Sequence, residues 1–187
     1  MSAATIIDAL ATGRIEAARD IVFEYLACTQ GEAGATVPRG IADLPPPLQA
    51  VLTSLAQRHD GSGALLLGVD GGEVVGCVGL SRSDVTEPTD GLVQRLYVRA
   101  PHRRRGIARA LMTAVHDHAR RKGFDRLVLN VMPSRAGAIA FHHRTSCRPM
   151  PDVERWPYLA VWFAFELKPV MDSGPVTCES HDAVVTF

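Results

Sequence analysis

The chain has 187 residues, of which 47% are hydrophobic and 21% are charged, and its formal net charge is zero. This length favours one domain with a sizeable core, and the composition is that of a globular protein. The sequence has no apolar run of about eighteen residues and no basic-then-apolar secretory signal near its start, so we expect a cytoplasmic protein without a membrane partner.

The first ninety residues predict two helices followed by a strand hairpin. The expected elements are an extended segment at Thr5–Ile7, a helix from a Thr12 cap to about Leu26, a helix from Pro45–Pro47 to about Asp60, and strands at Ala64–Val69 and Glu73–Leu80. Between the two strands, Asp70-Gly71-Gly72 is typical of a tight hairpin turn.

The second half predicts strands alternating with helices. The expected elements are a strand at Leu92–Arg99, a helix starting near Gly106, a strand at Arg126–Val131, a helix at Ala136–Arg144 capped by Ser134, and a strand at Leu159–Leu167. Strand–helix–strand connections produce parallel pairs, so we expect a mixed α/β (α+β type) sheet with a hairpin and one central parallel pair. Residues 169–187 are expected to be a flexible tail outside the domain.

A basic loop joins the strand at Leu92–Arg99 to the following helix. It contains Arg103, Arg104 and Arg105, and Gly106 follows at the predicted start of the helix. The first turn of a helix has unpaired backbone N–H groups and the positive end of the helix dipole, and a glycine lets an anion approach closely. The loop therefore predicts a phosphate-binding site. An ordinary solvated basic turn is the alternative.

Two adjacent patterns resemble one enzyme family. The spacing Arg103-x-x-Gly106-x-Ala108 resembles the pyrophosphate motif of the GNAT superfamily of N-acetyltransferases, and Gln94-Arg95-Leu96-Tyr97-Val98 resembles its central strand. The resemblance implies a GNAT-like domain over residues 1–168, with a mostly antiparallel sheet flanked by helices and acetyl-CoA as co-substrate. It leaves a homodimer open. The implied cofactor-binding residues are Leu96, Tyr97, Val98, Arg103, Arg104, Arg105, Gly106, Ile107, Ala108 and Arg135.

The general acid is where the sequence departs from the family. Many members have an Asn, an Ala and a Tyr along the helix after the fifth strand; here Arg135 stands at the Asn position and His142 at the Tyr position. An imidazolium could donate a proton to the departing thiolate, so His142 is the candidate catalytic residue. Alternatively, His142 and His143 are a surface pair, and the thiolate leaves without a protein acid.

The general base is less defined. Relatives with the same strand often have a Glu where this chain has Leu92. Glu87 and Asp90 precede the strand and could reach the site, although acidic residues beside a proline turn are more typical of a solvated surface. The amine could also arrive already neutral or lose its proton through water. Residues that could shape a substrate pocket, or simply pack, are Asp152, Glu154, Trp156 and Tyr158.

The charge distribution bears on the partners. Residues 1–90 hold twelve acidic and five basic residues, whereas residues 91–168 hold fifteen basic and five acidic ones. Coenzyme A phosphates account for the basic field, and few exposed aromatic residues accompany it, so no nucleic-acid partner is expected. The acidic part favours a cationic acceptor.

These patterns predict an N-acetyltransferase for a primary amine of a small or amino-acid-like molecule. The alternative is a GNAT-fold module that binds acyl-CoA or a regulatory partner with weak or no catalysis. The cysteines are scattered without metal-ligand spacing, which favours free thiols and no metal site. They are Cys28, Cys77, Cys147 and Cys178.

Overall fold

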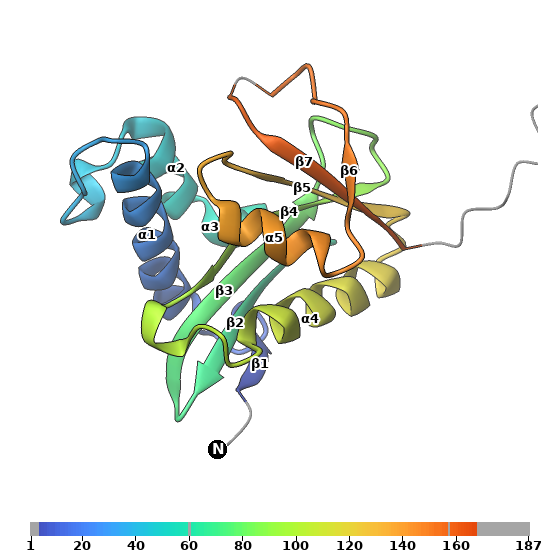
Figure 1. The fold of residues 1–187 in the computed structure, drawn as a ribbon. Helices are drawn as coiled ribbons and strands as arrows, with labels where there is room; N and C mark the ends of the chain where they lie inside the picture. The colour runs from blue at the N-terminus through green and yellow to red at the C-terminus, as the bar shows by residue number, and fades with distance from the viewer. Residues whose placement is uncertain (1–3, 60, 157, 168–187) are drawn as a thin grey trace, which may run out of the picture.

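The computed structural model describes residues 4–59, 61–156 and 158–167 (Figure 1). In this part of the chain, seven strands form one sheet with the order β1-β2-β3-β4-β5-β7-β6. The strands are β1 (Thr5–Asp8), β2 (Ala64–Asp70), β3 (Glu73–Arg82), β4 (Asp90–Val98), β5 (Arg126–Val131), β6 (Arg148–Met150) and β7 (Val161–Glu166).

The sheet is mostly antiparallel. Its one parallel pair joins β4 to β5, which are connected through the helix that follows the basic loop. The hairpin between β2 and β3 turns at Gly71 and Gly72, both of which have the positive φ that such a turn requires. The predicted mixed sheet with a central parallel pair is confirmed.

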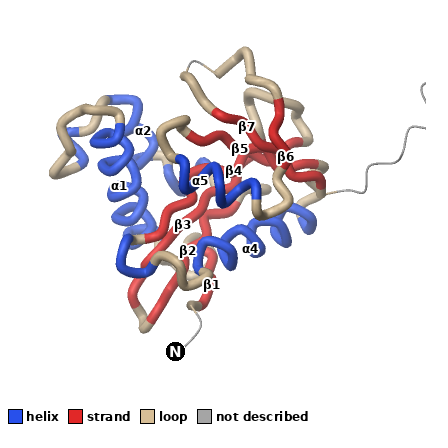
Figure 2. Tube along the Cα trace, viewed as in Figure 1, coloured by secondary structure: helices blue, strands red, loops and turns tan. Residues whose placement is uncertain are grey.

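Helices cover both faces of the sheet (Figure 2). Helix α4 contacts β2, β3 and β4 on one face, and α1 contacts β3 and β4 on the other. The α-helices are α1 (Ile15–Glu32), α2 (Pro46–Thr53), α3 (Leu55–Arg58), α4 (Ile107–Arg121) and α5 (Ala136–His143). Short 3-10 turns occupy Ile41–Asp43 and Ala100–His102. Within the described ranges, no helix is both long and apolar enough to cross a membrane.

Alternation along the strands builds two cores. Leu66 and Val75 pack with α4 residues such as Leu111 on one face, whereas Leu65 and Leu67 pack with α1 and α2 on the other. Burial of these side chains provides the main stabilisation of the layers, because it removes apolar surface from water. The same layering fixes β4 between α1 and α4.

Close packing requires glycine in β3. A Cβ on Gly76 would lie 2.8 Å from the Tyr97 carbonyl oxygen and 3.3 Å from Leu111 Cδ1 of α4. A side chain there would therefore separate β3 from β4 or push α4 off the sheet. At the start of α4, where the basic loop ends, Ile107 packs just as closely on β2, because a Cβ on Gly68 would lie 2.9 Å from its Cγ2.

Strands β4 and β5 stop pairing halfway along β4. The parallel register runs from Asp90 opposite Arg126 to Val93 opposite Leu129, and no further pairs are recorded between the two described strands. On its other edge, β4 contains a bulge, because Arg95 has a φ of +58° and the register with β3 shifts between Cys77 and Gly79. The backbone from the bulge to Val98 thus pairs with β3 alone.

Several predicted boundaries need correction. Helix α1 begins after Arg14 and runs six residues beyond the predicted end at Leu26, and the Thr12 hydroxyl donates to the Asp8 carbonyl instead of capping the helix. Ser134 does not cap α5, whose N-cap residue is Arg135. The predicted second helix divides at Ser54, and β6 was not predicted. The expected tail at 169–187 lies outside the described residues.

Candidate active site

The basic loop is braced against the hairpin. Arg103 Nε donates to the Val98 carbonyl at 2.9 Å, and Arg105 Nη1 lies 2.7 Å from Asp70 Oδ2 at the end of β2. His102 Nδ1 lies 3.3 Å from the same carboxylate oxygen. Two of the three predicted loop arginines therefore hold the loop in shape.

Arg104 is the exception among the loop arginines. It is exposed, it has a φ of +64°, and within the described chain no hydrogen bond or ion pair involves its guanidinium. Its side chain is thus a cation without a protein partner beside the start of α4. Such a group is available to an anionic ligand.

The start of α4 has the backbone geometry of an anion site. Gly106 is the N-cap residue with a φ of +83°, and a Cβ built on it meets nothing within 4 Å. The first hydrogen bond into the helix runs from Ala110 N to Gly106 O at 3.0 Å, so the amides of Ile107 and Ala108 precede the helical bonding pattern. The Ile107 side chain is buried in the core, which leaves its backbone for a ligand.

The predicted residues of β4 lie beside this helix start. The backbone of Leu96 and Val98 belongs to the half of β4 that no longer pairs with β5. The Tyr97 ring lies on the α1 face, where its centroid is 6.2 Å from that of Tyr25 in an edge arrangement. Burial raises the pKa of the Tyr97 phenol, so it stays protonated at neutral pH.

Arg135 is hydrogen-bonded to helix α1. Its Nη2 donates to Thr29 Oγ1 at 2.6 Å, its Nε donates to Glu32 Oε2 at 2.5 Å, and its guanidinium lies 5.2 Å from the Tyr25 ring centroid. All three partners are on α1. The structure therefore joins Arg135 to α1, where its partner Tyr25 in turn lies edge-on to Tyr97 of β4.

His142 is buried rather than on the surface. Only 4% of the residue is exposed, Nδ1 has no hydrogen-bond partner among the described residues, and the ring lies 5.6 Å from that of Phe163. Burial, together with the charge of His143, lowers the pKa of His142 to about 4. The imidazole is therefore neutral at neutral pH, whereas the expected acid role needs the imidazolium.

The candidate general bases lie in different surroundings. Asp90 is 2% exposed and accepts two hydrogen bonds from Arg126, at 3.0 and 2.6 Å, which makes it a structural group. Glu87 is exposed, and Leu92 is buried where relatives have a Glu. On α1, Glu24 is paired with Arg99. Asp90 and Glu24 are thus held in ion pairs, and Glu87 is left at the surface.

The segment before β7 contains two aromatic residues of different exposure. Trp156 packs edge-on against Trp162 with ring centroids 5.6 Å apart, whereas Tyr158 is 72% exposed. Trp156 thus packs in a small core cluster, while Tyr158 is available at the surface. Asp152 and Glu154 are exposed in the same segment. The three described cysteines are all free thiols.

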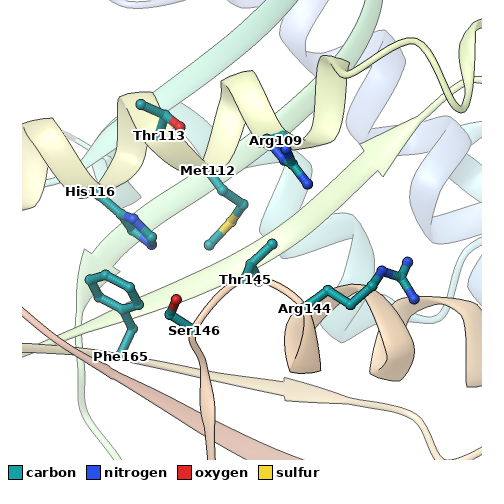
Figure 3. Close-up of a pocket in the computed structure, with 8 residues that line it drawn as sticks. All are labelled: Arg109, Met112, Thr113, His116, Arg144, Thr145, Ser146 and Phe165. Carbon is teal, nitrogen blue, oxygen red and sulfur yellow. The ribbon is translucent and has the colours of Figure 1, made fainter.

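A cavity of about 210 Å³ lies between α4 and the turn after α5 (Figure 3). Figure 3 shows α4 side chains facing Phe165 and the turn that follows α5. Its lining residues are Arg109, Met112, Thr113, His116, Arg144, Thr145, Ser146 and Phe165. The His116 ring stacks on Phe165 at 4.0 Å between centroids, and burial lowers the pKa of His116 to about 4. The two arginines supply the positive charge of this cavity.

Sequence reasoning missed the chemistry of Arg95. The residue is partly exposed, yet burial lowers the pKa of its guanidinium. Among the described residues, its side chain forms one hydrogen bond, to Gln94 Oε1 at 2.9 Å. No carboxylate of the described chain pairs with it. The available signal was a charged residue in the middle of the strand, between Val93 and Val98.

Solved structures share this fold. An acetyltransferase of the GNAT family from Staphylococcus aureus Mu50 superposes with a TM-score of 0.70 at 17% identity, covering 89% of this chain and 100% of its own. An N-acetyltransferase from the same strain has a TM-score of 0.62 at 17% identity, with coverages of 89% and 100%. YncA from Salmonella typhimurium, solved with its cofactor acetyl-CoA, has a TM-score of 0.63 at 18% identity, with coverages of 95% and 100%.

No curated protein is significantly similar in sequence to this chain. The acetyltransferase (GNAT) family, in contrast, matches residues 33–146, a segment that runs from the end of α1 through the basic loop and α4 to the turn after α5. That segment is more than half of the chain and contains the basic loop and the open start of α4 described above. The chain therefore belongs to the GNAT acetyltransferase family.

Proposed function

We propose that this protein transfers the acetyl group of acetyl-CoA to a primary amine of a small or amino-acid-like acceptor. One observation carries the proposal. The half of β4 that does not pair with β5 is followed, after the basic loop, by an open helix start with Gly106 at its N-cap. A free strand edge can bind an extended chain of amides, and a helix N-terminus can bind a pyrophosphate. Acetyl-CoA has these two groups one after the other.

The residues fit acetyl-CoA in three parts. The backbone of Leu96 and Val98 would hold the pantetheine amides, and the amides from Gly106 to Ala108 with the Arg104 side chain would hold the pyrophosphate. The cavity beside α4, with Arg109 and Arg144, would receive the adenosine end and its phosphate. When bound, acetyl-CoA supplies an acyl group activated as a thioester.

The chain's own contribution is mainly positioning. Holding the two reactants in contact removes most of the entropic barrier of a bimolecular reaction. In the transfer, the amine nitrogen bonds to the acyl carbon, the carbon–sulfur bond breaks, and the nitrogen loses a proton to water. A thiol has a pKa of about 8.5, by analogy with free Cys, so the thiolate can leave without a protein acid. The acid role of His142 stays a prediction, and its neutral, buried ring favours the unassisted route.

The acceptor would approach from the α1 side. Helix α1 packs against β4 on the face opposite α4, and it belongs to the acidic first ninety residues. A negative field attracts a protonated amine to the protein, although the amine must be neutral when it reacts. This field favours a cationic acceptor over a neutral or anionic one.

A second candidate function is an acyl-CoA-binding module with weak catalysis. Three positions that carry polar functional groups in many relatives hold Leu92, Arg135 and His142 here, and in the structure these are respectively buried, joined to α1, and neutral. In this alternative, acetyl-CoA would still be held by the backbone of β4 and the start of α4. This alternative predicts binding without turnover.

Two measurements separate the candidates. Titration calorimetry with acetyl-CoA and with CoA tests the binding site, and absence of binding at millimolar concentrations would contradict both functions. Release of free thiol with a panel of amines, amino acids and peptides tests catalysis. Turnover of small amines supports the enzyme, turnover of peptide N-termini alone would reverse the acceptor class, and binding without turnover supports the module.

A further inference from the structure

We propose that the Arg95 guanidinium binds a carboxylate of the acceptor, so that the preferred substrates are amino carboxylic acids rather than simple amines. This inference rests on the proposed function and names the acceptor class of the same site.

The bulge in β4 determines the position of Arg95. The bulge in β4 places two residues, Arg95 and Leu96, opposite the single residue Val78 of β3. Arg95 then lies on the α1 face, because Tyr25 of α1, Arg58 of α3 and Cys77 of β3 act on its charge. The buried His59, which follows α3, interacts with the same charge. Arg95 therefore lies on the acceptor side of the strand and immediately before the backbone expected to hold the pantetheine.

The second observation is the lack of a counter-charge. The other partly buried arginines have carboxylate partners: Arg99 has Glu24, Arg126 has Asp90 and Arg135 has Glu32. Among the described residues, Arg95 has none, and its side chain is hydrogen-bonded only to the neutral Gln94 amide. A deep cation without a counter-ion is costly, and a ligand carboxylate would offset that cost.

The third observation is the backbone conformation. Arg95 has a φ of +58°, a region where a non-glycine residue is strained. Burial also lowers the pKa of Arg95, while an arginine guanidinium keeps its charge in proteins. A long basic side chain in a strained position on the acceptor side is better explained by ligand binding than by packing.

The chemistry of the ligand follows from the geometry of guanidinium. Its planar pair of N–H donors matches the two oxygens of a carboxylate, and the contact is strongest away from bulk water. In an α-amino acid the amine and the carboxylate are attached to the same carbon. A carboxylate on Arg95 would therefore hold the amine close to Leu96, where the acyl group is expected.

The test uses acceptors that differ only in the carboxylate. Leucine is compared with 3-methylbutylamine and phenylalanine with 2-phenylethylamine, with thiol release giving kcat/KM for each. The wild-type protein should prefer the amino acids by about 100-fold, as expected for a buried charge pair. Arg95→Gln should lower kcat/KM for the amino acids by about 100-fold while changing the values for the amines and the affinity for acetyl-CoA by less than about threefold.

Arg58→Gln is the matched control, because Arg58 is an exposed arginine of α3 that acts on the same region. It should leave the preference for amino acids within about threefold of wild type, as expected for a solvent-screened charge. Arg95→Lys, which keeps the charge but not the paired donors, should recover part of the lost activity. Circular dichroism melting curves establish that each variant is folded.

Different results would contradict carboxylate recognition by Arg95 and the proposed acetyl transfer. If the wild type turns over simple amines as well as amino acids, or if Arg95→Gln lowers both equally, carboxylate recognition is wrong although the enzyme stands. If acetyl-CoA does not bind, the proposed function fails, and Arg95 is tested by titrating leucine and phenylalanine into wild type and Arg95→Gln. Binding by wild type alone then supports the carboxylate site, and no binding at about 10 mM overturns it.

Discussion

Arg135 Nη2 donates to Thr29 Oγ1 at 2.6 Å, which ties the first turn of α5 to the last third of α1 across 106 residues of sequence. Glu32 and Tyr25 complete the contact from the same helix. The tie joins the segment that follows β5 to the helix that covers β4, at the level where β4 and β5 no longer pair. Arg135 therefore fixes the position of α1 relative to the diverging strands.

Replacement of Arg135 by alanine should destabilise the fold without weakening acetyl-CoA binding. Loss of hydrogen bonds to a partly exposed carboxylate and a hydroxyl should lower the free energy of unfolding by about 1–2 kcal/mol, measured by urea denaturation. Calorimetry should give an acetyl-CoA affinity within about threefold of wild type. A loss of affinity beyond about tenfold would restore Arg135 to the cofactor site. Glu32→Gln, on the opposite side of the contact, should reproduce part of the destabilisation.

Arg104 should contribute to acetyl-CoA binding through its charge. Because it has no protein partner in the described chain, Arg104→Ala should leave stability nearly unchanged and weaken acetyl-CoA binding by about three- to tenfold at low salt. The loss should shrink at high salt, since the interaction is exposed. Arg121→Ala removes an exposed arginine from the far end of α4 and serves as the control. Equal losses in both variants would indicate a general effect of net charge instead.

Gly106 should matter for both conformation and ligand approach. With a φ of +83°, Gly106→Ala should cost about 1–2 kcal/mol of stability and should also obstruct the anion at the helix start. Gly123, at the other end of α4, has a φ of +75° and equally open surroundings. Gly123→Ala should therefore cost the same stability while keeping acetyl-CoA affinity. If both variants bind acetyl-CoA like wild type, the start of α4 is not the pyrophosphate site.

The parts of the fold that the sequence predicts are local ones. The strand, the basic loop and α4 follow one another, and their patterns depend on near neighbours: the three- and four-residue spacing of Ile107, Leu111 and Val115, and the glycines at both helix ends. The hairpin at Gly71-Gly72 was predictable for the same reason. Strand β6, in contrast, has three residues with Pro149 in the middle and forms only by pairing with β7.

The parts of the site that the sequence does not predict depend on distant residues. The burial of His142 comes from Phe163, which lies on a strand of the last third of the chain, and the partners of Arg135 lie on α1. From the sequence, Arg95 is only one residue of a predicted strand. That it lacks a carboxylate partner among the described residues can be seen only in the folded structure. Contacts between residues so far apart in the chain leave no periodic pattern in the sequence from which they could be predicted.

Asp90 should be important for stability rather than for proton transfer. It is 2% exposed and bound by Arg126 at 3.0 and 2.6 Å, next to the paired start of β4 and β5. Asp90→Asn should cost about 3 kcal/mol of unfolding free energy, because it breaks a buried ion pair. Asp117→Asn, in an exposed pair with Arg120 at 3.6 Å, should cost less than about 0.5 kcal/mol. If the Asp90→Asn variant is folded and binds acetyl-CoA but loses turnover, Asp90 is instead the general base.

His142 should make the fold sensitive to acid. Its pKa is about 4 in the folded protein against an ordinary value of 6.5, so the unfolded chain binds the proton more readily between these values. Stability contributed by the neutral ring is therefore fully present above pH 6.5 and is lost as the pH falls towards 4. The loss reaches about 3 kcal/mol at most. His142→Phe, which fills the same apolar site, should remove this part of the acid sensitivity in urea titrations at pH 7 and pH 4.5.

The same variant decides the acid role. At pH 7, a pKa of about 4 leaves about one His142 ring in a thousand protonated, so His142→Phe should keep turnover within about threefold and leave the pH profile unchanged. If His142 is the acid, turnover should instead fall by about ten- to a thousandfold, and the wild-type rate should decline as pH rises through the pKa of its imidazole. Nuclear magnetic resonance titration of the ring locates that pKa independently. A value near 6.5 together with the loss of turnover would establish His142 as the proton donor, whereas a value near 4 with turnover retained leaves the thiolate to depart unaided.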